Sequence, residues 1–169
     1  MAEDEVILIG NWNEAEELLA LFVDNVDETI ENIIREYLEE KREEFVAYIE
    51  QDVFGLAPLS DRYLRWKLSK GLDPRTLIAT GTYLAAIKLA PVDIGGWGIG
   101  ILHGEYGDNG QPLKAIGDAL EYGTRETQSS SFRMPPRPHW RPMAELIQDE
   151  FPDYLMNRLE QIWAGAGMK

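Results

Sequence analysis

A long amphipathic pattern occupies the first third of the chain and limits what the chain can fold into. From Asn13 onward, apolar residues recur every three or four positions, the spacing that places them on one face of an α-helix. The residues of this face are Leu19, Phe22, Val23, Val26, Ile30, Ile33, Ile34, Tyr37, Leu38, Phe45, Ile49 and Val53. A continuous helix of ~38 residues would be roughly 57 Å long, more than the width of a small domain. Part of it must therefore lie against something else.

Local signals predict where this helix begins and where it could be interrupted. Asn13, with Glu16 three residues later, has the form of an N-cap and its capping-box partner. Asp27 could cap a second helix if the pattern breaks near residues 24–27. Ahead of the helix, the apolar run "VILIG" (residues 6–10) could form a short strand or a tethering arm.

The acidity of the protein is confined to this same segment. Residues 1–52 hold 17 acidic and three basic residues, which accounts for the whole net charge of −14. The acidic side chains form either a solvated helix face or a surface that packs on a neighbouring subunit. We predict that residues 1–54 form an acidic helical arm and residues 55–169 an α+β body. Because an acidic face repels DNA, we expect no specific DNA binding.

The body is expected to begin with a short basic helix. Ser60 is the predicted N-cap of a helix over residues 61–70, and Gly71 is its C-terminal stop. Residues 55–84 carry a net charge of +3. This stretch is the electrostatic complement of the acidic helix, within one subunit or between two.

Two strands and two further helices complete the expected fold. The segments "TYLAAIKLAPVDI" and "GWGIGILHGEYG", joined through Gly95 and Gly96, predict an antiparallel hairpin. Helical spacing returns over residues 112–123 and 143–163, where Pro152 either kinks the helix or begins another. The fold class is therefore α+β: a long N-terminal amphipathic helix, a small antiparallel sheet packed with helices, and a C-terminal helix.

The residues give little support for catalysis or for a bound metal. The chain has no cysteine, and its two histidines, His103 and His139, lie far apart in the sequence, so no metal site is expected. No serine lies in a G-x-S-x-G context, so we predict no catalytic residue. The run "GGWGIG" lacks the third glycine of a dinucleotide fingerprint, because His103 stands there, and no cofactor is expected.

The chain also lacks sequence signals for membranes or export. No apolar run approaches the ~20 residues that span a bilayer, and the first residues do not resemble a signal peptide. We therefore expect a cytoplasmic protein without membrane contact.

The segment "FRMPPRPHWRP" (residues 132–142) combines four prolines with three arginines and a tryptophan. Its prolines favour an extended backbone leading into the last helix, and this backbone would present the arginines and Trp140 as contact groups. The predicted interface residues are Arg62, Arg65, Lys67, Glu121, Tyr122, Arg133, Pro136, Arg137, Pro138, Trp140 and Arg141. The alternative for Arg137 is local: it caps helix 112–123 or pairs with Glu121 in the same subunit.

Three short runs, "APLSDRYLRWKLSKG…LIATGTYLAAI", "LEYGT" and "PPRPHWRPM", occur in this order between about residues 56 and 163. Together they resemble the phage virion morphogenesis family, the tail-completion and head-to-tail joining (neck) proteins of tailed bacteriophages. The matching positions are Pro58, Leu59, Lys67, Thr80, Gly81, Leu84, Glu121, Tyr122, Gly123, Pro136, Arg137 and Pro138. The chain departs from the family at His139 and Trp140, where members usually have Phe and an aliphatic residue.

The resemblance implies an α+β subunit of a virion ring, without enzymatic activity. It implies a homo-oligomer of six or twelve subunits that contacts other neck, portal-side and tail proteins, while DNA passes through its channel. The protein would assemble in the bacterial host cytoplasm and end in the neck or tail of the virion. The alternative is a cytoplasmic adaptor whose residues 132–142 are an extended ligand for a proline-recognising partner.

Overall fold

Helix α1 (Trp12–Glu50) runs without interruption through most of the acidic segment, residues 1–52. In this computed structural model, which describes residues 12–92, 96–124 and 134–165, its 39 residues extend over about 58 Å. The possible break near residues 24–27 does not occur. The proposed cap at Asn13 is wrong, because the helix already includes Trp12.

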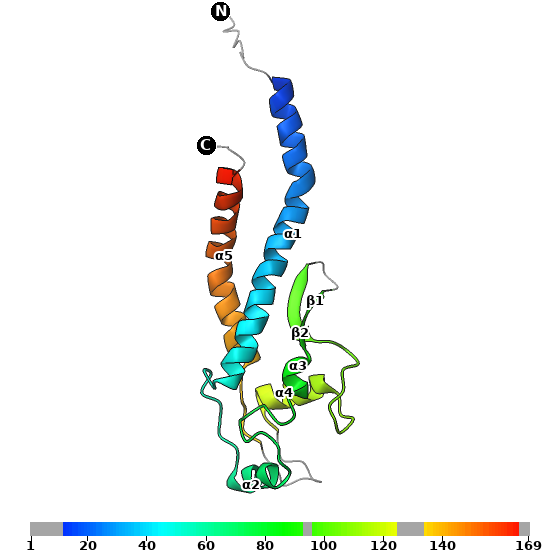
Figure 1. Ribbon diagram of the computed structural model, residues 1–169, viewed down its shortest axis with the longest axis vertical. Helices are drawn as coiled ribbons and strands as arrows, with labels where there is room; N and C mark the ends of the chain where they lie inside the picture. Colours follow the sequence, from blue (N-terminus) through cyan, green and yellow to red (C-terminus); the bar gives the residue numbers. More distant parts are fainter. Residues whose placement is uncertain (1–11, 93–95, 125–133, 166–169) are drawn as a thin grey trace, which may run out of the picture.

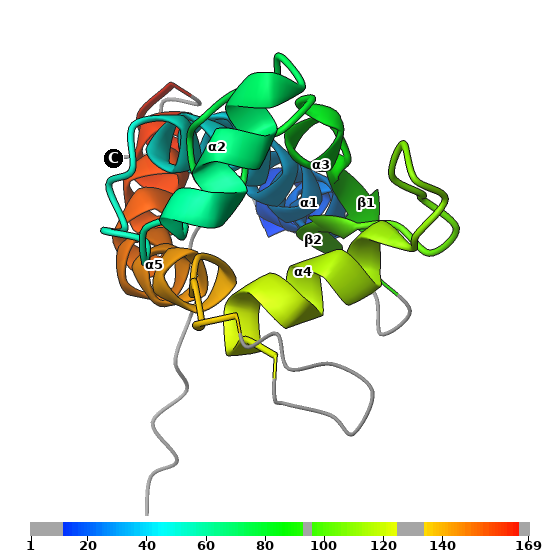
Figure 2. The ribbon, with the colours of Figure 1, turned by 90° about the horizontal axis from the view of Figure 1, so that it is seen from below.

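The remaining elements form an antiparallel partner for α1 and a small body near its C-terminal end (Figure 1). They are α2 (Asp61–Ser69), α3 (Thr82–Ala85), β1 (Ile87–Pro91), β2 (Trp97–Ile101), α4 (Leu113–Tyr122) and α5 (Trp140–Gly165). Figure 2 shows α2, α4 and the beginning of α5 grouped around the end of α1, with the β-hairpin to one side. The α+β class, the long first helix and the C-terminal helix are confirmed.

Antiparallel packing of α5 on α1 is held by aromatic contacts and by ion pairs. Tyr37 of α1 lies between two aromatic rings of α5, with ring centroids 5.2 Å from Phe151 and 4.7 Å from Tyr154. Arg158 pairs with Glu36 at 2.6 Å, farther toward the N-terminal end of α1. Helix α5 continues through Pro152 as one element, so no second helix begins there.

The β-hairpin contacts α1 through Trp97, the first residue of β2. Its strands are antiparallel, with Ile87 opposite Ile101 and Pro91 opposite Trp97. The Trp97 indole N–H donates to Glu31 of α1 at 2.9 Å, and the Arg35 guanidinium lies 4.5 Å from the Trp97 ring centroid. These contacts fix one face of the hairpin against the middle of α1.

The first strand begins later than its sequence pattern predicts. Residues 82–85 form the single helical turn α3, and the strand starts at Ile87. Gly81 precedes the turn with φ = +85°, a conformation that glycine adopts without strain. This turn places Tyr83 and Leu84 in the core, which an extended backbone would have placed on opposite faces.

One hydrophobic core joins α1 to α3, the β-hairpin, α4 and α5. Phe45 and Ile49 of α1 pack with Tyr83, Ile87 and Met143, which come from α3, β1 and α5. The C-terminal half of α1 therefore packs in the same core as residues beyond the expected boundary at residue 54. Within the described residues, no helix combines the length and apolar character needed to cross a membrane.

Replacing Phe45, which is completely buried, tests this core. Phe45→Ala leaves a cavity between α1 and α5 and is expected to lower the free energy of unfolding by about 3–5 kcal/mol in urea titrations. Val53→Ala, at a position 56% exposed just beyond α1, should change it by less than about 0.5 kcal/mol. Equal effects of the two substitutions would contradict the shared core.

Candidate functional site

Glu121, at the end of α4, is buried and caps the beginning of α5. Its Oε2 accepts the backbone N–H groups of His139 at 2.8 Å and Trp140 at 3.0 Å, and its Oε1 accepts that of Arg141 at 3.2 Å. The first N–H groups of a helix have no partner within the helix, and a negative charge there is further favoured by the helix dipole. A side chain from one helix therefore supplies the N-cap of another.

Arg137 is also buried, with 4% of its surface exposed, and its side chain forms hydrogen bonds within the subunit. Its guanidinium donates from Nε to the Ala57 carbonyl at 2.7 Å and from an Nη to the Pro58 carbonyl at 3.0 Å. Its backbone N–H donates to the Leu120 carbonyl at 2.7 Å, near the C-terminus of α4. The local interpretation of Arg137 is thus the one that the geometry favours, although its side chain binds two loop carbonyls rather than Glu121.

A chain of hydrogen bonds behind the cap fixes the protonation of His139, which is fully buried. Its Nδ1 faces the Arg137 carbonyl at 2.8 Å, which can only accept, so Nδ1 carries the proton. Its Nε2, 2.7 Å from the Tyr83 hydroxyl, then accepts from that hydroxyl, whose oxygen in turn accepts the Trp140 indole N–H at 3.0 Å. Burial lowers the pKa of His139, because the charged form would lose its solvation.

Gly123 allows the segments on either side of residues 125–133 to approach each other. A Cβ at this position would lie 2.7 Å from the Met134 carbonyl oxygen, and the residue has φ = +73°. Thr124 exchanges two hydrogen bonds of 3.0 Å with the Met134 backbone, one through its own N–H and one through its hydroxyl. The runs "LEYGT" and "PPRPHWRPM" thus pack directly against each other.

The predicted interface residues fall into separate groups. Glu121, Arg137 and Lys67 are buried, and the Lys67 ammonium donates to the carbonyls of Arg75 (2.8 Å) and Ile78. The side chains of these three residues form their hydrogen bonds within the subunit. Two of the remaining predicted residues, Arg62 and Arg65, are exposed on α2. Three others line one hollow of about 380 Å³: Tyr122, Trp140 and Arg141. Pro136 is exposed, Pro138 is partly buried, and Arg133 lies outside the described residues.

An apolar groove of about 700 Å³ lies between α2, the residues that follow it, α4 and Met134. The rings of Tyr63 and Trp66 stack at its edge, 5.3 Å apart, and remain 40% and 47% exposed. Its walls include Leu72, Leu77, Ile116 and Leu120. No sequence pattern predicted this groove. The available signal was the pair of aromatic residues three positions apart in an otherwise basic helix.

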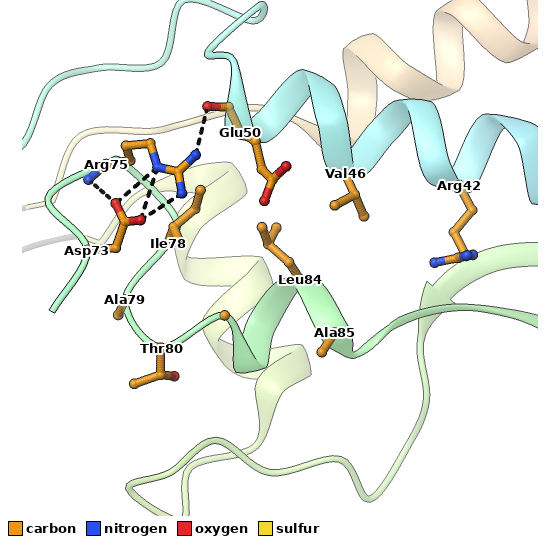
Figure 3. A pocket seen from close by; sticks show the side chains of 11 residues that line it. Arg42, Val46, Glu50, Asp73, Arg75, Ile78, Ala79, Thr80, Leu84 and Ala85 are labelled. Carbon is orange, nitrogen blue, oxygen red and sulfur yellow. Dashed lines mark hydrogen bonds and ion pairs between the residues drawn. The ribbon is translucent and has the colours of Figure 1, made fainter.

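A second hollow, of about 450 Å³, lies between the end of α1 and the loop before α3 (Figure 3). Asp73 accepts four hydrogen bonds from Arg75, which lower the pKa of its carboxyl group to about 2. Arg75 also donates to the Glu50 carbonyl at 3.4 Å. The charged groups here hold the loop to α1.

In residues 12–92, 96–124 and 134–165, no three Asp, Glu or His side chains gather closely enough to hold a metal ion. Comparisons with protein-family models, with curated proteins and with solved structures found no match to this chain.

Removing the cap should destabilise the whole subunit. Glu121→Ala leaves three backbone N–H groups without their acceptor and is expected to lower the free energy of unfolding by about 2–3 kcal/mol. Asp118→Ala, on the exposed side of the same helix, removes only a surface pair with Lys114 and should change it by less than about 0.5 kcal/mol. Urea unfolding monitored by circular dichroism measures both. A Glu121 variant as stable as the Asp118 variant would contradict the capping role.

The buried histidine should make stability depend on pH. The pKa of His139 is depressed from 6.5 in the folded state, so the unfolded chain binds its proton first as the pH falls. Its contribution is complete above about pH 6.5 and is lost as the pH falls from there toward the folded pKa. The free energy of unfolding should therefore decrease between pH 7.5 and pH 5.5, and His139→Gln should reduce that decrease.

His103→Gln is the matched control, because His103 is exposed and is the other histidine of the chain. This variant should keep the pH dependence of the unmodified protein in the same urea titrations. If His103→Gln and His139→Gln change that dependence equally, the assignment to the buried ring is wrong.

Proposed function

We propose that the protein is a ring-forming structural component of the neck of a tailed bacteriophage, which joins or finishes the tail during assembly. The observation that carries this proposal is an elongated subunit (Figure 1) with exposed acidic side chains along α1 and exposed basic side chains on α2. Contacts between unlike surfaces of identical subunits are heterologous, and they close into rings when the rotation between neighbours allows it. The three sequence runs that resemble neck proteins supply the biological context.

The acidic and basic surfaces of one subunit do not neutralise each other. Glu28, Glu31, Glu39, Glu40 and Glu43 are exposed along α1. Arg62 and Arg65 are exposed on α2, at the opposite end from the start of α1. Among the residues that the structure describes, no ion pair joins α1 to α2. This arrangement favours complementarity between two subunits over complementarity within one.

The α1/α5 pair also presents apolar side chains to solvent. Met156, Ile162 and Trp163 of α5 are 52%, 40% and 37% exposed. A pair of helices buries only the faces that meet, so these side chains remain available to a neighbouring molecule. They lie toward the C-terminal end of α5, away from the body.

The adaptor alternative is disfavoured by the packing of its proposed ligand. In the described part of the segment, Arg137 and His139 are buried, and the backbone N–H groups of residues 137 and 139–141 are already bonded to α4. A proline-recognising partner needs an extended segment that it can surround.

Ring assembly is tested on the purified full-length protein, alone and with portal-side and tail components of the same phage. Light scattering and electron microscopy should reveal symmetric oligomers, with six or twelve subunits. Reversing the charge of the basic end (Arg62→Glu with Arg65→Glu) should raise the concentration needed for assembly about tenfold. Lys114→Glu, an exposed reversal on α4, should leave it unchanged.

A strict monomer that binds neither neck nor tail components would contradict the proposal. Gene order gives an independent check, because capsid, portal and tail genes beside this one are expected.

A further inference from the structure

The groove beside α2 has the character of a docking surface for an apolar segment. Its walls are mostly apolar, and it leaves Tyr63 and Trp66, two residues that bury large areas when they contact a partner, 40% and 47% exposed. Exposed apolar patches of this kind mark interaction sites on soluble proteins. The groove does not coincide with the buried cap at Glu121, whose role is internal to the subunit.

We propose that this groove binds residues 3–10 of a second copy of the chain. This segment, "EDEVILIG", joins three acidic residues to four consecutive apolar ones. Val6, Ile7, Leu8 and Ile9 supply the apolar side chains that suit the groove walls. The inference rests on the proposed ring and names one of the contacts that would build it.

The length of α1 requires that the segment come from another copy. Residues 3–10 are attached to the N-terminal end of α1, whereas the groove lies beyond its C-terminal end, about 58 Å away (Figure 1). Even fully extended, the chain from Val6 to Trp12 spans no more than about 20 Å. A chain therefore cannot place its own apolar run in its own groove, but it can reach the groove of a neighbour.

Charge complementarity also favours residues 3–10 of another copy as the segment that binds the groove. Glu3, Asp4 and Glu5 directly precede the apolar run. Arg62 and Arg65 are exposed on α2, the helix that also carries Tyr63 and Trp66. Arg62 and Arg65 do not line the groove, but each lies next to one of the two aromatic residues that do. The apolar run would thus fill the groove while the acidic residues before it meet the flanking arginines, and the contact should weaken as salt screens the charges.

The contact would be heterologous, because an arm at one end of each subunit binds a groove at the other end of the next. Such a contact leaves every subunit with one arm to donate and one groove to fill, so it propagates until the ring closes. It would give the long acidic helix a mechanical role, as the spacer that carries the arm to the adjacent subunit.

Directed disulfide formation between two full-length chains tests this inference, since the protein contains no cysteine of its own. One variant carries Ile9→Cys in the arm, and the other carries Thr76→Cys in the groove wall. A disulfide requires Cα atoms within roughly 7 Å, so cross-linking reports on close approach. The mixed variants should form a cross-linked pair at least about tenfold faster than Ile9→Cys mixed with Ala115→Cys, an exposed site on α4 outside the groove.

A second measurement separates the groove from proximity alone. Adding Tyr63→Ala and Trp66→Ala to the Thr76→Cys chain should slow cross-linking about tenfold, while the thermal melting of that chain shows that it remains folded. Equal rates at Thr76 and Ala115 would overturn the inference. A second outcome would also overturn it: cross-linking shows no preference for Thr76, and the variant with Tyr63→Ala and Trp66→Ala no longer binds portal or tail components. The groove would then bind a different protein.

The outcomes also distinguish this inference from the proposed function. If the protein forms symmetric rings but cross-linking shows no preference for Thr76, the proposed arm contact is wrong and the proposed ring still stands. Selective cross-linking in a protein that forms open chains only, and that binds no neck or tail component, would support the arm and contradict the neck assignment.

Discussion

The carboxylate of Glu121 accepts three backbone N–H groups at the start of α5, and the arrangement of the long helices depends on this contact. It fixes α5 relative to α4, and through α5 it fixes the partner on which α1 packs. The groups around it are also satisfied, since Arg137 binds the Ala57 and Pro58 carbonyls and His139 binds Tyr83. A buried charge is tolerated here because each of its partners is a hydrogen-bond donor already held in place.

The proline-rich segment is therefore a connector within the subunit. Its backbone and the side chains of Arg137 and His139 tie together α4, the loop before α2 and the beginning of α5. Pro136 is exposed to solvent. Arg141 and Tyr122 are also exposed, and they line one hollow together with Trp140. The rigidity that the prolines confer serves the fold first, and within residues 134–142 only Pro135, Pro136 and Arg141 are exposed to other molecules.

The surfaces that remain are separated along the length of the molecule. Acidic side chains and exposed apolar residues follow α1 and α5, and the basic, aromatic surface of α2 lies at the other end. An elongated subunit that keeps unlike surfaces apart is suited to repeated contacts with copies of itself, because the acidic surface of one copy can meet the basic surface of the next. This separation is the physical basis of the ring that we propose.

The sequence by itself determined the elements, since helical spacing in α1, α4 and α5, the cap at Ser60 and the alternation in β2 are local properties. It did not determine the turn α3, because the packing of Tyr83 and Leu84 overrode a strand-like pattern. Only the tertiary structure decided which charged residues are exposed. Lys67 and Arg62 look alike in a basic helix, yet one is buried among loop carbonyls and the other faces solvent. Such differences depend on residues distant in sequence, and the groove beside α2 exists for the same reason: its walls meet only when the chain has folded.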